Sequence, residues 1–97
     1  ALRRVFDDGS DPARTMPIDF HVAVPNELVA ERVAEAARRQ GFDVNVYGDD
    51  GGWTVECTRI MLATHAGITA IERQLDTLAR PHGGHADGWG TFGNADA

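Results

Sequence analysis

Side chains that could bind a metal ion gather near the end of the chain, in the spacing His82-x-x-His85-x-Asp87. Histidine nitrogens and carboxylate oxygens are common ligands of transition metals. The spacing matches no strong zinc pattern, however, and the surrounding glycines indicate a loop that leads into a strand. We therefore expect no metal and no other cofactor, and keep a metal or small-ligand module built on His82, His85 and Asp87 as an alternative.

The single cysteine, Cys57, lies where apolar and polar residues alternate. A free cysteine in such a pattern is usually a small buried core residue and not a nucleophile. The sequence has no Ser-His-Asp pattern, no phosphate-binding glycine loop and no carboxylate pair at helix-face spacing. We therefore predict no catalytic residue and no enzyme activity. One cysteine also excludes an intramolecular disulfide. The absence of disulfides is typical of proteins in the reducing cytoplasm, where we expect this protein to be.

A tryptophan between two glycines, in Asp87-Gly88-Trp89-Gly90-Thr91, is the most informative segment. In one interpretation Trp89 packs under the turn-forming loop 7–12 and stabilises the fold. In the other, Trp89 and its neighbours form a partner-binding edge, because tryptophan is enriched at interface hot spots. The candidate partner-binding residues are Asp87, Gly88, Trp89, Gly90 and Thr91, together with Asp8, Gly9, Ser10 and Asp11 of the loop.

Composition restricts the classes of partner. The 97 residues predict a single domain with a thin core, in which residues 1–16 form a turn and loop segment and residues 93–97 a mobile tail. Fifteen acidic residues against nine arginines give a net charge of −6. A phosphate-binding surface needs clustered Lys and Arg, so this balance argues against nucleic acid. No apolar run is long enough to span a membrane.

Alternating and helical periods predict the elements that position these segments. Ile18, Phe20, Val22 and Val24 alternate with polar residues and predict a strand. A helix follows over 27–40, capped by Asn26 and ended by Gly41, with an expected apolar stripe of Val29, Val33, Ala36 and Ala37.

Two further strands, a second helix and a last strand are expected after Gly41. We expect strands at 42–47 and 53–61, joined by a hairpin loop over 48–52. A helix capped by Thr64 presents Ile68, Ile71, Leu75 and Leu78 on one stripe, and Pro81 with the next two glycines ends it. A glycine-rich strand over 85–92 completes a β-α-β-β-α-β order, the ferredoxin-like α+β sandwich of two helices on one face of a four-stranded antiparallel sheet.

The face of the sheet opposite the helices tests for RNA binding. Ferredoxin-like sheets that bind RNA stack bases on aromatic residues of that face. Here the two central strands would present Asp19, His21, Ala23, Thr54, Glu56 and Thr58, with no aromatic platform and negative charge. Direct contact with nucleic acid is therefore not expected.

The sequence resembles the RraB family of ribonuclease E regulators from Asp8 to Phe92. The resemblance is carried by Asp8-Gly9-Ser10-Asp11-Pro12, Phe20-His21, Gly41-Phe42, Cys57, the helix with Ile71, Gln74, Leu75 and Leu78, and Asp87-Gly88-Trp89-Gly90-Thr91. It implies a ferredoxin-like fold and a protein that binds RNase E, or a related nuclease, and inhibits RNA cleavage by protein–protein contact. A homodimer formed by pairing of edge strands is a further alternative.

Overall fold

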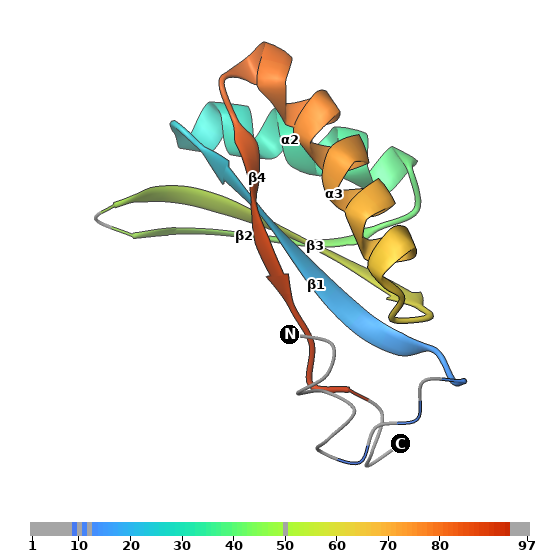
Figure 1. Cartoon of the computed structure of the whole chain (residues 1–97). Helices are drawn as coiled ribbons and strands as arrows, with labels where there is room; N and C mark the ends of the chain where they lie inside the picture. Colours follow the sequence, from blue (N-terminus) through green and yellow to red (C-terminus); the bar gives the residue numbers. More distant parts are fainter. Residues whose placement is uncertain (1–8, 10, 12, 50, 94–97) are drawn as a thin grey trace.

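Within the described residues, four strands and two helices follow one another in the order that the sequence predicts. The computed structural model describes residues 9, 11, 13–49 and 51–93. The elements are β1 Met16–Val24, α2 Glu27–Arg39, β2 Asp43–Asp49, β3 Gly52–Met61, α3 His65–Ala79, the 3-10 turn η1 Arg80–His82, and β4 His85–Gly90. The sheet order is β2-β3-β1-β4 and the paired strands are antiparallel. Both helices lie on one side of this sheet (Figure 1), so the ferredoxin-like prediction is confirmed.

The core lies between the helices and one face of the sheet. On β1, Met16, Ile18, Phe20 and Val22 are fully or almost fully buried, which is the face that the period of two predicts. Their partners on β3 include Val55 and Cys57, both fully buried. From α3, Ile68 and Leu75 complete the same cluster. β1 begins at Met16, two residues before the first position that the alternation identifies.

The first helix buries a stripe that differs from the expected one. Asn26 is the N-cap, as expected, and its Oδ1 accepts a hydrogen bond of 2.9 Å from the Val29 backbone N–H. The buried residues are Ala30, Val33, Ala34 and Ala37, whereas Val29 and Ala36 are only partly buried. The small alanine side chains allow close approach to the sheet, so the contact line follows the alanines rather than the larger Val29.

The hairpin between β2 and β3 is tighter than predicted. Pairing continues through Gly48–Trp53 to Asp49–Gly52, so three of the five residues expected in the loop belong to strands. Gly48 permits this because its Cα lies under the Trp53 ring, where a Cβ would come within 2.7 Å of ring carbons. The glycine composition that indicated a loop therefore reflects, at Gly48, close packing within the ladder.

The second helix follows its prediction closely. Thr64 is the N-cap and its Oγ1 accepts from the Gly67 N–H at 3.0 Å. Ile68 and Leu75 are buried, while Ile71 and Leu78 are partly buried against the core. Gly83 has a φ of +83°, the left-handed conformation that ends η1. No helix within the described ranges combines the length and the apolarity that a membrane crossing requires.

One face of the sheet carries no helix. Residues opposite each other in neighbouring strands point to the same side, so the register assigns this face. We call it the uncovered face; its members on β2, β3 and β1 are Asp43, Asn45, Tyr47, Thr54, Glu56, Thr58, Asp19, His21 and Ala23, with Ile60 and Pro17 at one end. The six positions predicted on the two central strands all belong to it, and all six are partly buried.

Candidate functional site

The segment that contains Trp89 forms β4, an edge strand beside β1. Ala86 is paired with Val22, and Trp89 with Phe20. The register therefore shifts between Phe20 and Val22 and leaves a bulge at residues 87 and 88. Gly88 has a φ of +98°, a backbone conformation that glycine adopts without strain. The glycine-rich composition of this strand correctly indicated an irregular edge.

Trp89 lies on the covered face of the sheet. Its partner across the ladder, Phe20, is 1% exposed and lies in the core, and Trp89 is partly buried against that core. The indole therefore contributes to stability while a part of it stays accessible at the sheet edge. Its packing against loop 7–12 falls outside what the structure describes, because most of that loop is not described.

Gly90 occupies the opposite face, and the space where its side chain would lie is empty. It is paired with Asp19 of the uncovered face. An added Cβ would meet nothing within 4 Å, and the Gly90 backbone is not in the left-handed region. The fold therefore does not require a glycine at this position. The bare backbone leaves room for another molecule to approach.

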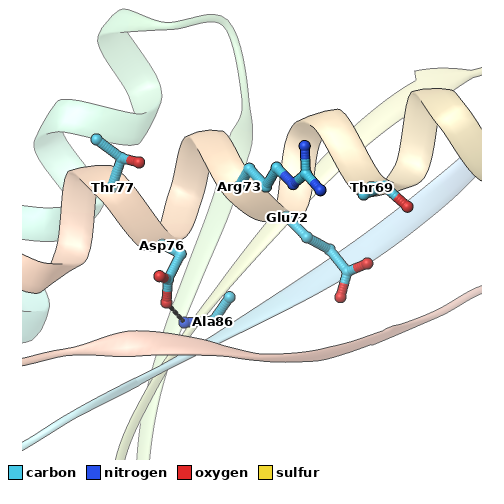
Figure 2. A pocket seen from close by; sticks show the side chains of 6 residues that line it. All are labelled: Thr69, Glu72, Arg73, Asp76, Thr77 and Ala86. Carbon is cyan, nitrogen blue, oxygen red and sulfur yellow. Dashed lines mark hydrogen bonds between the residues drawn. The ribbon is translucent and has the colours of Figure 1, made fainter.

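The carboxylate of Asp76 holds the start of β4 against α3. Its Oδ1 accepts a hydrogen bond of 2.9 Å from the Ala86 backbone N–H, and its Oδ2 accepts one of 3.0 Å from Arg80 Nε. Figure 2 shows the first of these bonds across the shallow groove between α3 and β4, which Thr69, Glu72, Arg73 and Thr77 also line. The hydrogen bonds from Arg80 and Ala86 lower the pKa of Asp76.

Sequence reasoning missed Asp76. The i,i+4 spacing to Arg80 indicates an ordinary ion pair on the helix surface. The bond that matters runs from the backbone of a residue ten positions later in the chain, and no side-chain pattern signals a backbone donor. Only the tertiary arrangement of α3 and β4 brings these two groups together.

The end of the candidate segment is tied to β1. The Thr91 hydroxyl donates a hydrogen bond of 2.6 Å to the Pro17 carbonyl, and Thr91 Oγ1 accepts one of 3.0 Å from the Gly93 N–H. With Asp76 at one end and Thr91 at the other, β4 is fixed at both ends around its bulge. Asp87 and Gly88, at the bulge itself, are exposed.

The second predicted segment is only partly visible. Asp8 and Ser10 lie outside the described residues. Gly9 has a φ of +94° and is exposed. Asp11 forms a local turn, in which its Oδ1 accepts from the Ala13 N–H at 2.8 Å and its carbonyl accepts from the Arg14 N–H at 3.2 Å. The described atoms of this segment thus have the turn geometry that its composition predicts.

The proposed metal ligands do not converge. Within the described part of the chain, no three His, Cys, Asp or Glu side chains come close enough together to hold an ion. His82 ends η1, His85 begins β4, and Asp87 lies at the bulge, and all three are exposed. The alternative of a metal module on these residues therefore has no geometric support.

Polar pairs cross the uncovered face between β1 and β3. Thr58 donates a hydrogen bond of 2.6 Å to Asp19 Oδ1, and His21 Nε2 lies 3.4 Å from Glu56 Oε2. These contacts orient the two carboxylates without removing them from solvent: 28% of the Glu56 side chain stays exposed. The face is therefore polar and accessible.

Comparison with known proteins identifies the family. The model of the family described as "RraB: Regulator of ribonuclease activity B" matches residues 1–91, which end just after β4. The chain belongs to this family. The RraB resemblance stated from the sequence is thereby confirmed.

Individual members of the RraB family are similar over almost the whole chain. A protein named Regulator of ribonuclease activity B from Actinobacillus succinogenes is 32% identical over 94% of this chain and 68% of its own length. Its namesakes from Haemophilus influenzae and Escherichia coli (strain K12) are 29% and 30% identical over 94% of this chain, which spans 63% and 70% of their lengths. Membership supports a regulatory role toward a ribonuclease, and thus a protein partner.

Proposed function

We propose that this RraB-family chain acts in the cytoplasm by binding an endoribonuclease of the RNase E type and inhibiting its cleavage of RNA through protein–protein contact. The family match over residues 1–91 is the observation that carries the proposal, because the members are named for regulation of ribonuclease activity. On this proposal the chain supplies a surface and performs no chemistry.

The contact proposed for the nuclease is the edge formed by β4, residues Asp87 to Thr91. Three features support it. The strand is fixed at its ends by Asp76 and Thr91, so the surface is ordered before binding. Trp89 keeps an accessible part at the edge, and tryptophan is frequent among residues that dominate binding energy. Gly90 leaves the neighbouring backbone open to close approach.

Trp89→Phe is the variant that tests this edge. Phenylalanine keeps an aromatic ring against Phe20 and the core, so we expect the fold to persist with a loss of about 1 kcal/mol or less. It removes the indole N–H and part of the contact area. We expect inhibition of RNA cleavage by the purified nuclease of the same organism to need about tenfold more protein.

Trp53→Phe is the matched control. Trp53 is the other tryptophan; it is also partly buried on the covered face and packed against the core, at the hairpin end of β3, where it lines a pocket with Asp87 but not with Trp89. Its substitution should leave inhibition unchanged. Equal losses for the two variants would reject the β4 edge, and a wild-type protein that neither binds nor inhibits the nuclease would reject RNase E as the target.

A further inference from the structure

The uncovered face carries carboxylates on three neighbouring strands. Asp43, Thr58 and Asp19 form one row across β2, β3 and β1, and Asn45, Glu56 and His21 form the next. Adjacent strands are about 4.8 Å apart, so the Asp43 and Asp19 positions are separated by about 10 Å, with Glu56 on the strand between them. The three acidic groups therefore lie within the span of a few residues of a bound polypeptide.

The arginines of α2, α3, η1 and β3 lie away from the uncovered face. On α2, three glutamates balance three arginines, and on α3 with η1 two acidic residues balance two arginines. Arg59 is the arginine of β3, but it lies on the covered face, where its guanidinium is 3.8 Å from the Phe42 ring centroid and donates to the Gln40 carbonyl. Arg14, the remaining described arginine, precedes β1. The helical layer is close to neutral, whereas the uncovered face is negative.

Apolar and bare positions flank the acidic rows. Ile60, paired with Pro17 at one end of the sheet, is 67% exposed, and Tyr47, at the edge strand β2, is 41% exposed. Gly90 extends the row of Asp19 onto β4 and leaves its Cβ position empty. The face therefore combines three carboxylates with apolar contacts at its margins and a place for close backbone approach.

We propose that the uncovered face binds a basic protein segment, rich in arginine and lysine with apolar residues between them. Carboxylates form strong, oriented hydrogen bonds with the guanidinium group of arginine. Complementary charge also raises the association rate of the two molecules. The identity of the partner rests on the proposed function: the segment is one through which the nuclease holds RNA, since such regions carry the Lys and Arg that neutralise phosphates. The chain then competes with RNA for that segment.

A synthetic peptide of alternating arginine and leucine is the probe, titrated into the isotope-labelled chain and followed by amide NMR. We expect shifts to concentrate on β1, β2 and β3 residues of the uncovered face and to weaken as salt is added, because exposed charges are screened. Shifts confined to α2 and α3, or no binding at all, would overturn the proposal.

Variants that replace carboxylates by amides distinguish the effect of the uncovered face from the effect of the net charge. The triple variant Asp19→Asn, Asp43→Asn and Glu56→Gln keeps side-chain oxygens that can still accept the Thr58 and His21 contacts, so folding should persist. We expect it to bind the peptide about tenfold more weakly. The matched control, Glu27→Gln, Glu31→Gln and Glu35→Gln on α2, changes the net charge equally and should bind as wild type does. Equal weakening, or none, in the two triple variants would overturn the proposal.

The nuclease itself provides the second readout. Raising the RNA concentration should relieve inhibition by wild type. The triple variant of the uncovered face should inhibit about tenfold less well. If the peptide binds this face but the nuclease does not bind the chain, the proposed function is rejected and the proposed binding surface is retained. Inhibition unchanged in the triple variant would reject the surface and leave the proposed function standing.

Discussion

At the scale of single residues, Gly84 and Gly90 differ in whether the fold has room for a side chain. Gly84 is buried, and an added Cβ would come within 2.8 Å of the Ala23 carbonyl oxygen and 2.9 Å of Val24 Cγ1. Gly90 would place the same atom in open space. The first glycine is thus required by packing, and the second is not required by the fold.

Substitution by alanine should separate these roles. Because the Ala23 carbonyl belongs to the central strand β1 and cannot move freely, we expect Gly84→Ala to lower the free energy of unfolding by about 1–3 kcal/mol. Gly90→Ala should change it by less than about 0.5 kcal/mol. Urea unfolding of both variants measures this, and a stable Gly84→Ala protein would contradict the packing described for residue 84.

The sequence explained Gly83 but not Gly84. Glycine is common after a helix because it adopts the left-handed conformation there, and Gly83 has a φ of +83°. Gly84 does not have a left-handed backbone; it is a glycine because β1 passes beside it. Local chemistry can predict a backbone angle, whereas close approach of a distant strand depends on the tertiary fold.

At the scale of elements, β1, the two helices and their caps followed from local patterns. Period two identified β1, and Asn26 and Thr64 were recognised as caps because their side chains act on backbone a few residues away. For the candidate edge, the sequence indicated which residues form it but not how they are oriented or anchored. Which face Trp89 occupies depends on the register shift against β1, and the anchoring of β4 depends on Asp76; both are long-range features.

The Asp76 anchor makes the attachment of β4 dependent on pH. Since the folded-state pKa is lowered below the ordinary 3.8, the anchor stabilises β4 above that value and is lost as pH falls through the lowered pKa. We expect the amide signals of Ala86 and its β4 neighbours to change together on acidification. Asp76→Asn retains an oxygen acceptor for the Ala86 N–H but cannot titrate, so its β4 signals should not show this change.

Glu35 supplies the control for that titration. It forms the same i,i+4 pair with an arginine, at 2.7 Å from Arg39, but on the exposed surface of α2. Glu35→Gln should leave the pH response of β4 as it is in wild type. If the response persisted in Asp76→Asn, the anchor would not be its cause.

At the scale of the whole molecule, the two layers have separate tasks. The helices and the covered face hold the core, with Cys57 near its centre, opposite Phe20 and Val44. The uncovered face and the β4 edge carry the surfaces proposed for partners. Nothing described pairs with the outer edges of β2 and β4, so a homodimer through edge strands stays a prediction that a solution mass measurement can test.

Alkylation of Cys57 can test whether the helices move away from the sheet. Its side chain is fully buried, and burial, helped by the nearby negative charge of Glu56, raises the pKa of the thiol from 9.0 to about 12. The thiolate is the reactive form, so iodoacetamide should not modify the folded protein at neutral pH. Alkylation should proceed only through unfolded molecules, and rapid modification without denaturant would show that the sheet opens locally.

The same thiol predicts how stability changes in alkaline solution. Below pH 9.0 the thiol is protonated in both the folded and unfolded states, so the folded protein loses nothing by burying it. Between pH 9.0 and about 12 the unfolded state releases the proton while the folded state retains it, and the free energy of unfolding falls. Cys57→Val, which fills a similar space without a titratable group, should lose less stability over this range in thermal melts. An identical alkaline decline in wild type and Cys57→Val would mean that other groups govern it.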